Sequence, residues 1–291
     1  MTQVLVEDDT VALLGEAPRW HVGERQLYWV DIAASALHRY DPLTGKRDTR
    51  TFAEPVGCFA FVRSGGFVLG MREGFALLDD WASDPVPFGT PILRGLSDLR
   101  LNDGRTDSIG RFWAGSYDGQ KTGRAALYRL SGEGTVDKVV GDMMTSNGAA
   151  FSPDGRTFYH ADTPTHAIRQ FPYDPETAQL GEGRIFHQFP AGRGRPDGGS
   201  VDAEGCYWSA LYDGGRVVRL SPAGDILREI ALPVSRPTMI AFGGDDLCTA
   251  FVTSARQGLS PEELLAQPLA GALFSFRVDV PGLPEVDFVL R

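Results

Sequence analysis

The chain has 291 residues, of which 42% are hydrophobic and 23% charged, with a formal net charge of −10. This composition is typical of a folded, soluble protein, and the acidic balance argues against a nucleic acid partner, because phosphates are neutralised by clustered lysine and arginine. The sequence contains neither a run of about eighteen apolar residues nor a basic start followed by an apolar segment, so we expect no membrane span and a cytoplasmic location.

Short aromatic-rich strands separated by glycine- or proline-containing turns recur along the chain. The first unit predicts strands over 27–32 and 36–40, followed by a turn over 41–45. Similar units begin near residues 66, 110, 151, 201 and, less regularly, 240. The interval of about 39 to 49 residues is that of a four-stranded propeller blade. The pattern therefore predicts an all-β, six-bladed β-propeller that occupies residues 1–291 as one domain.

A propeller ring must close, because a single blade cannot bury both of its faces. We expect the apolar segment at Leu5 and Val6 to join the last blade, and a short apolar strand over 288–290. The only predicted helix is brief, over 260–266. It has Ser260 as its N-cap and Pro261 at the first helical position.

Polar residues gather in four segments that we interpret as turns just ahead of blades one, three, four and five. Equivalent positions in a repeat converge on the propeller axis, and the side chains concerned are Glu16, Asn102, Asp103, Asn147 and Asp197. Oxygen ligands that converge in a channel indicate a cation, so the prediction includes a central metal-binding channel. The alternative is a set of ordinary surface turns, since segments such as Asn147-Gly148 are common turn formers.

Several other chemistries are excluded by their missing motifs. The sequence has no Gly-x-Ser-x-Gly elbow, no His-Glu-x-x-His, no phosphate-binding loop with its lysine and no Cys-x-x-Cys. Its five histidines show no ligand spacing. These absences disfavour a serine hydrolase and a zinc protease.

The polar segments, taken in order, resemble those of the SMP-30/gluconolactonase/regucalcin-like family, and in particular its bacterial sugar-lactonase branch. The resemblance covers nearly the full length. It is carried by Leu14-Gly15-Glu16-Ala17-Pro18, Arg100-Leu101-Asn102-Asp103-Gly104, Ser146-Asn147-Gly148, Ser152-Pro153-Asp154-Gly155, Pro196-Asp197-Gly198 and the stretch from Gly214 to Leu220.

The resemblance implies a six-bladed propeller that hydrolyses sugar lactones with a divalent metal in its channel. It implies that Glu16, Asn147 and Asp197 are the metal ligands. It also implies that Arg100 and Asn102 contact the hydroxyl groups of the sugar, with Asp103 beside them. Lys121 stands where some members carry a substrate-contacting glutamate. We further expect Tyr117, Asp118 and Tyr212 to shape the pocket wall, with solvated loop positions as the alternative.

Two carboxylates and an amide oxygen are a nearly neutral set for a divalent ion, which can polarise a lactone carbonyl. We expect Asp197 to be the general base. All-oxygen ligation favours Ca²⁺, while Mg²⁺, Mn²⁺, Zn²⁺ and Fe²⁺ remain open. The expected partner is an aldono-1,4- or 1,5-lactone, and the expected state is a monomer or weak homo-oligomer. Two alternatives are an organophosphate or other ester hydrolase at the same site, and a non-catalytic calcium-binding propeller.

Overall fold

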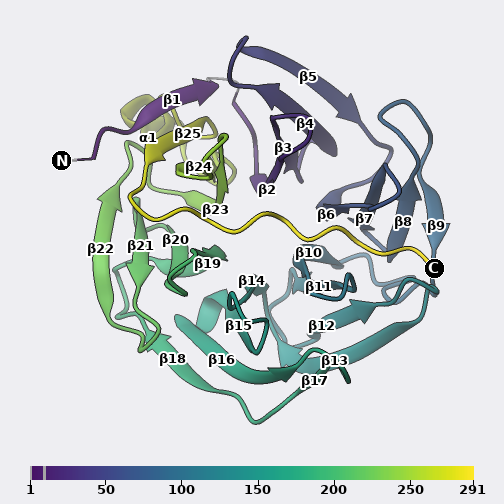
Figure 1. Ribbon diagram of the computed structural model, residues 1–291. Helices are drawn as coiled ribbons and strands as arrows, with labels where there is room; N and C mark the ends of the chain where they lie inside the picture. The colour runs from purple at the N-terminus through teal and green to yellow at the C-terminus, as the bar shows by residue number, and fades with distance from the viewer. Residues whose placement is uncertain (1, 9–10) are drawn as a thin grey trace.

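The computed structural model describes residues 2–8 and 11–291 and shows six antiparallel sheets arranged as a ring (Figure 1). The predicted all-β, six-bladed propeller is therefore confirmed. Within each blade the strands lie side by side, with the inner strand at the axis of the ring and the outermost strand at its rim. None of the helices in the described residues is long and apolar enough to cross a membrane.

The first three blades each contain four strands. Blade 1 comprises β2 (Gly15–His21), β3 (Gln26–Asp31), β4 (Ala36–Asp41) and β5 (Lys46–Thr51). Blade 2 comprises β6 (Val56–Phe61), β7 (Phe67–Met71), β8 (Phe75–Leu78) and β9 (Val86–Phe88). Blade 3 comprises β10 (Leu99–Thr106), β11 (Phe112–Asp118), β12 (Ala125–Leu130) and β13 (Val136–Met143).

Blade 4 has one strand more, because β16 pairs with both β17 and β18. It comprises β14 (Ser146–Phe151), β15 (Thr157–Asp162), β16 (Ala167–Asp174), β17 (Gln179–Leu180) and β18 (Arg184–Gln188), with a 3₁₀ turn over Thr163–Thr165. Blade 5 comprises β19 (Arg195–Val201), β20 (Tyr207–Tyr212), β21 (Arg216–Leu220) and β22 (Ile226–Ala231). Blade 6 comprises β23 (Pro237–Gly243), β24 (Thr249–Ser254), β25 (Leu273–Arg277) and, from the start of the chain, β1 (Leu5–Asp8).

The two ends of the chain are both attached to the ring. Strand β1 pairs with β25, opposite Ser275 and Phe274. Residues 278–291 cross the middle of the ring as an extended segment (Figure 1). The strand expected over 288–290 is wrong: Phe288 makes only an isolated parallel bridge with Val62. The predicted helix is present as α1 (Pro261–Ala266), and Ser260 caps it in a complete capping box.

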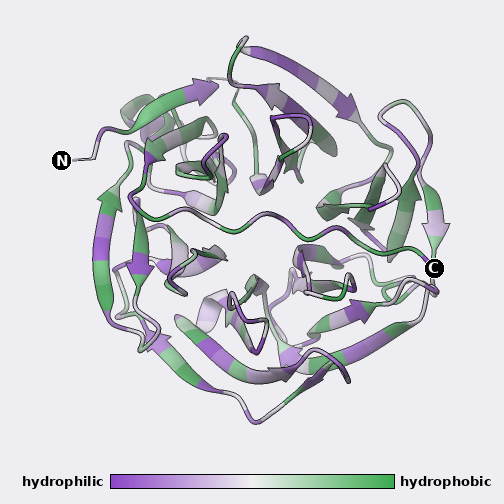
Figure 2. Cartoon of the chain, in the orientation of Figure 1, coloured by the Kyte–Doolittle hydropathy of each residue, from purple (hydrophilic) through white to green (hydrophobic). Residues whose placement is uncertain are grey.

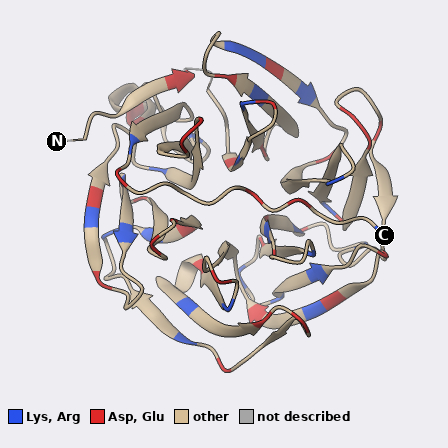
Figure 3. Ribbon diagram, viewed as in Figure 1, with Lys and Arg blue, Asp and Glu red and all other residues tan. Residues whose placement is uncertain are grey.

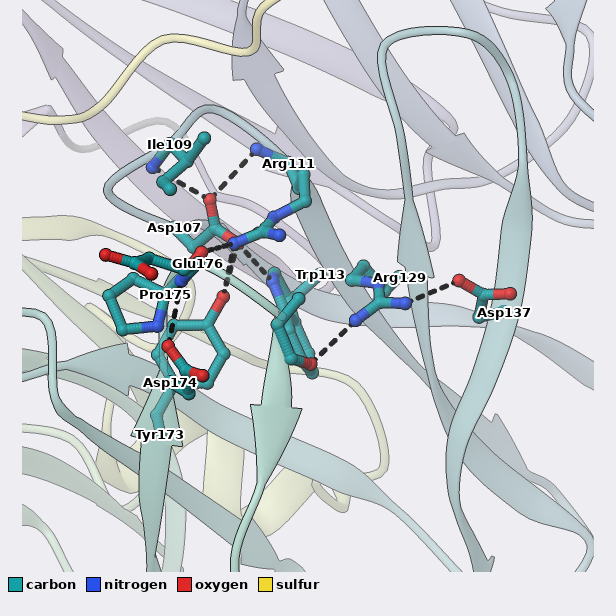
Figure 4. Close-up of polar contacts among 11 residues, drawn as sticks. Asp107, Ile109, Arg111, Trp113, Arg129, Asp137, Tyr173, Asp174, Pro175 and Glu176 are labelled. Atoms are coloured by element: carbon teal, nitrogen blue, oxygen red, sulfur yellow. Dashed lines mark hydrogen bonds and ion pairs between the residues drawn. The ribbon is translucent and has the colours of Figure 1, made fainter.

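A buried aspartate links the inner strand to the second strand in two of the blades. In blade 3 the Asp107 carboxylate accepts hydrogen bonds from Trp113 Nε1 at 3.0 Å and from the Tyr173 hydroxyl at 2.7 Å (Figure 4). In blade 5 Asp202 accepts from Trp208 Nε1 at 2.9 Å in the same way. Both carboxylates are fully buried. In both blades the aspartate precedes by six residues the tryptophan whose side chain it holds in place.

Aromatic side chains join neighbouring blades. Trp113 of blade 3 packs on Phe158 of blade 4, with ring centroids 5.4 Å apart, and Trp208 of blade 5 packs on Phe242 of blade 6 at 5.8 Å. Contacts of this kind stabilise each interface by burying large apolar areas. The outermost strands instead carry many charged residues, as β5, β13 and β22 show (Figures 2 and 3). The core therefore lies between the blades, and charge is confined mainly to the rim and the axis.

Candidate active site

The four polar segments lie inside inner strands, not in turns ahead of them as the sequence analysis placed them. Each contains a β-bulge, where the register against the second strand shifts. The shifts fall between Glu16 and Arg19, Leu101 and Gly104, Asn147 and Ala150, and Pro196 and Gly199. A bulge bends a strand and changes the direction of its side chains. The glycines of these segments therefore serve the bulges and do not form turns. Gly148 has φ +62°, and a Cβ on it would lie 2.3 Å from the Tyr207 hydroxyl oxygen.

These bulges surround a cavity of about 480 Å³ at the end of the channel where the inner strands begin. A volume of this size suits a small-molecule ligand. The predicted site residues that line the cavity are Glu16, Arg100, Asn102, Lys121, Asn147 and Asp197. They come from blades 1, 3, 4 and 5, so the structure brings together side chains that lie as far as 181 residues apart in the sequence.

A chain of hydrogen bonds connects four of these side chains. Arg100 Nη1 donates to Asn102 Oδ1 at 2.6 Å, and Asn102 Nδ2 donates to Asn147 Oδ1 at 2.9 Å. Asn147 Nδ2 in turn donates to Asp197 Oδ1 at 2.5 Å. The order of donors and acceptors fixes the orientation of both amides and aims the Asn147 amide at the Asp197 carboxylate.

Glu16 faces the same cavity from blade 1. Its carboxylate is buried and accepts a long hydrogen bond of 3.3 Å from the amide of Ala17, which has the left-handed φ of 47°. Burial, followed by the charge of Asp103, raises the pKa of Glu16 to about 8. Burial, followed by the charge of Glu16, also raises the pKa of Asp197 well above its ordinary value. The site therefore holds two acids whose ionised forms are disfavoured by burial and by the charges of neighbouring acids.

A divalent cation fits this set of donors. Two carboxylates carry the charge that such an ion neutralises, and the Asn147 amide oxygen retains a second lone pair beside the hydrogen bond from Asn102. Hard oxygen donors of this kind suit Ca²⁺, Mg²⁺ and Mn²⁺. The described residues contain no group of three or more His, Cys, Asp or Glu placed to hold a metal, so the amide is needed to complete a three-ligand set.

Asp103 lies behind the cavity wall and does not line the cavity. Its carboxylate accepts hydrogen bonds from the backbone amides of Ala149 at 2.9 Å and Gly104 at 2.7 Å. The bond from Ala149 ties inner strand β10 to inner strand β14. The geometry therefore gives Asp103 a role in joining blades 3 and 4, and its contact with substrate stays a prediction.

The end of β11 and the loop after it carry three further predicted residues, Tyr117, Asp118 and Lys121. Tyr117 lines the cavity, and the Arg100 guanidinium stacks on its ring at 4.8 Å. Lys121 also lines the cavity and is exposed. Asp118 does not line it: this buried carboxylate holds the loop by accepting from the amides of Gln120 at 3.0 Å and Thr122 at 2.9 Å.

Two aspartates that hold the site in place were missed by the sequence analysis. Asp31, at the end of β3, accepts from the amides of Leu13 at 2.7 Å and Leu14 at 3.0 Å, just ahead of Glu16. Asp162, at the end of β15, binds the amide of Thr145 at 2.8 Å, just ahead of Asn147. A signal was available, because both aspartates end the second strand of their repeat.

Thr163 completes the support of the acid pair. Its hydroxyl accepts from Asn147 Nδ2 at 2.8 Å and donates to the Pro196 carbonyl at 2.9 Å. It thereby links the asparagine of blade 4 to the residue before Asp197. No sequence pattern pointed to this threonine, because it lies in a short 3₁₀ turn outside the repeated strands.

The fold and site together define a class: a six-bladed propeller with two buried acids and an asparagine amide at the wall of a cavity at one end of its channel. Residues 14–256 match the family model described as the SMP-30/Gluconolactonase/LRE-like region, and the chain belongs to this family. It is 45% identical over 283 residues to a 6-deoxy-6-sulfogluconolactonase of Pseudomonas putida, covering 94% of each chain. It is 34% identical over 283 residues to regucalcin of Gallus gallus, again covering 94% of each.

A solved structure shows the same architecture. The regucalcin of Agrobacterium tumefaciens strain C58, described as a calcium-binding protein, superimposes with a TM-score of 0.94 at 28% identity. The match covers 100% of this chain and 98% of that one. The family and the fold are thus supported by independent comparisons.

Proposed function

We propose that this protein hydrolyses the cyclic ester of a sugar lactone to the open aldonic acid, assisted by a divalent cation bound to Glu16, Asn147 and Asp197. The observation that carries the proposal is the pair of buried acids Glu16 and Asp197, together with the Asn147 amide that bonds to Asp197, at the wall of a cavity of about 480 Å³. Family membership supports it, as does the similarity to a relative named as a sulfogluconolactonase.

A bound divalent cation supplies Lewis-acid polarisation of the lactone carbonyl and acidifies a bound water. Asp197 accepts the proton of the attacking water at its carboxylate, while the water oxygen bonds to the carbonyl carbon. The bond between that carbon and the ring oxygen then breaks, and Asp197 returns the proton to the departing oxygen. The Asn147 amide holds the Asp197 carboxylate in position through the 2.5 Å hydrogen bond.

Arg100, Asn102 and Lys121 bind the sugar in this proposal, since all three line the cavity. Arg100 is restrained on one side by Tyr117 and on the other by Asn102, so its remaining N–H groups are pre-organised for hydroxyl groups. Oxygen ligation favours Ca²⁺ as the resident ion. The sulfonated lactone of the Pseudomonas putida relative is one candidate substrate, alongside neutral aldonolactones.

The test is proton release from a panel of aldono-1,4- and 1,5-lactones, using protein stripped with chelator and resupplied with one metal at a time. We expect release above the spontaneous rate to return only with a divalent ion. A phosphotriester that is cleaved faster than every lactone would contradict the proposal in favour of an organophosphate hydrolase. Metal binding measured by calorimetry without any turnover would instead indicate a binding propeller.

A further inference from the structure

The cavity wall carries more positive than negative charge, although the chain as a whole has a net charge of −10. Four cationic side chains line it, namely Arg100, Lys121, Arg195 and Arg236, against the two acids Glu16 and Asp197. When the nearby Asp213 is also counted, one positive charge is in excess. Asp103 lies behind the wall, where its charge interacts with Arg19 and Arg105, and these three residues are left out of the count. A divalent cation on the two acids would increase that excess. Positive charge concentrated in a cleft attracts an anionic ligand.

Two of these cations form a fixed pair on one tyrosine. Arg195 begins β19 and Arg236 directly precedes β23, yet both guanidinium groups stack on the Tyr212 ring, at 5.3 and 5.2 Å from its centroid. Both also pair with the single carboxylate of Asp213, Arg236 Nε at 2.7 Å from Oδ1 and Arg195 Nη2 bonded to Oδ2. We call Arg195 and Arg236 the rim pair. One carboxylate can neutralise only one of its two members.

The rim pair retains free donors. Arg236 Nη1 donates to the Gln257 carbonyl at 2.5 Å, which leaves Nη2 without a partner among the described residues. Within the same part of the chain, Arg195 bonds only through Nη2, so its Nε and Nη1 are unused. The two guanidinium planes are thus held by stacking and by internal bonds, while further N–H groups remain for a ligand.

The rim pair lies within reach of the proposed reaction centre. Arg195 precedes Asp197 by two residues on β19, which corresponds to about 7 Å along a strand. Both side chains line the same cavity. A small sugar lactone can therefore place its carbonyl near Asp197 and a substituent from elsewhere on the sugar near the rim pair.

We propose that the rim pair binds an anionic substituent, a sulfonate or a phosphate ester, carried by the sugar part of the lactone. This inference rests on the proposed function and names the substrate class of that site. Guanidinium groups present paired N–H donors that match the oxygens of such anions, and these charge-assisted bonds are stronger than bonds to a neutral hydroxyl. Lys121 adds a further positive charge to the cavity wall.

The experiment compares gluconolactone with its 6-deoxy-6-sulfo and 6-phospho counterparts. Wild-type protein is expected to prefer an anionic lactone, and the sulfonate and phosphate arms show which anion is favoured. Arg236→Gln and Arg195→Gln should each lower the ratio of kcat/KM for anionic over neutral lactone by about 10- to 100-fold, mainly through KM. Arg236→Lys, which keeps the charge but loses the planar fork, should fall between wild type and Arg236→Gln.

The matched control is Arg169→Gln. This exposed arginine also stacks on an aromatic ring, 5.7 Å from the centroid of Phe171, and bonds a backbone carbonyl, that of Gly183 at 2.8 Å, but it does not line the cavity. It should leave the ratio unchanged. Turnover of the neutral lactone, together with thermal unfolding, reports whether each variant is folded.

A wild-type preference for the neutral lactone, or a ratio that neither rim substitution moves, would overturn the inference. If no lactone is hydrolysed at all, the proposed function fails instead. Anion recognition is then read separately, by calorimetric binding of the open-chain 6-sulfo acid to wild type and Arg236→Gln. Equal affinity in that measurement would also overturn the inference.

Discussion

The two ends of the central channel satisfy their charges in opposite ways. At the end covered by residues 278–291, Arg19 and Arg105 both bond to the carboxylate of Glu285, at 3.4 and 2.5 Å. Burial alone raises the pKa of Glu285, but Arg105 and Arg19 outweigh it and hold that pKa below its ordinary value. This closed end is internally neutralised by Glu285, from the far end of the chain, together with Asp103, whose charge also interacts with both arginines.

At the open end the acids Glu16 and Asp197 are buried without a bonded cation among the described residues, and the pKa of each is raised. The same inner strands serve both ends: β2 carries Glu16 and Arg19 three residues apart. The difference teaches that buried charge at this axis is structural where the chain supplies its counter-charge, and is available for a ligand where it does not.

The largest expected effect is on catalysis at the open end. Asp197→Asn should lower kcat/KM for the preferred lactone by about 10²- to 10⁴-fold, because the amide cannot accept the proton of the attacking water. The change preserves size and an acceptor for Asn147. Asp154→Asn, in an exposed turn of blade 4, is the control and should keep full activity. Retained activity in Asp197→Asn, measured by proton release, would remove Asp197 from the mechanism.

The closed end should respond in stability. Glu285→Gln removes the carboxylate to which two buried guanidinium groups bond and leaves them one acid, Asp103, which should cost about 3–5 kcal/mol of the free energy of unfolding. Urea denaturation measures the change. Glu133→Gln, which removes an exposed acid 3.5 Å from Arg291, should leave the free energy of unfolding nearly unchanged. Similar losses in both variants would mean that the Arg19–Arg105–Glu285 cluster is no more important than a surface ion pair.

A smaller effect is expected when the missing charge is supplied to the open end. A divalent ion at about 100 times its dissociation constant should stabilise the chelator-treated protein by about 2.7 kcal/mol. Calorimetric melting with and without Ca²⁺ measures this. The shift should shrink strongly in Glu16→Gln and persist in Glu133→Gln. An equal shift in all three proteins would place the cation elsewhere.

The smallest effect concerns the pH dependence of stability at His38, a residue outside the channel that serves as a reference for the two ends. Burial, followed by the charge of Arg47, lowers the pKa of His38 to about 4. The folded state thus favours neutral His38, whose contribution to stability is complete above pH 6.5 and is lost as the pH falls towards 4. We expect His38→Gln to lose about 1–3 kcal/mol less than wild type between pH 7 and pH 4 in urea titrations. If His38→Gln loses as much stability as wild type between pH 7 and pH 4, other groups cause the sensitivity to acid.

The propeller was predictable because its repeat has a local sequence pattern. Strand, turn and strand recur at a regular spacing, with an aromatic residue to fill each interface between neighbouring blades. The convergence of Glu16, Asn147 and Asp197 followed from their equivalent places in that repeat. The same reasoning also placed Asp103 in the pocket. The bulge in β10 turns its carboxylate towards backbone amides instead, and no sequence period shows which of two adjacent polar residues a bulge directs inward.

The rest depended on contacts between distant segments. Glycine-bearing segments such as that around Asn147 are strands because their bulges pack against neighbouring inner strands, whereas local preference indicates turns. The rim pair joins residues 41 positions apart through Tyr212 and Asp213. Glu285 reaches Arg19 across 266 positions. Such pairings become visible only when the ring is closed.

The most direct test of the contrast between the two ends is one chemical change made at both. Glu16→Gln and Glu285→Gln should be melted side by side in chelator at pH 8. We expect shifts of opposite sign: Glu16→Gln removes an uncompensated buried acid and raises the melting temperature by about 2 °C or more, whereas Glu285→Gln lowers it. A lower melting temperature in both variants would show that the open end is internally neutralised as well, and would contradict the account.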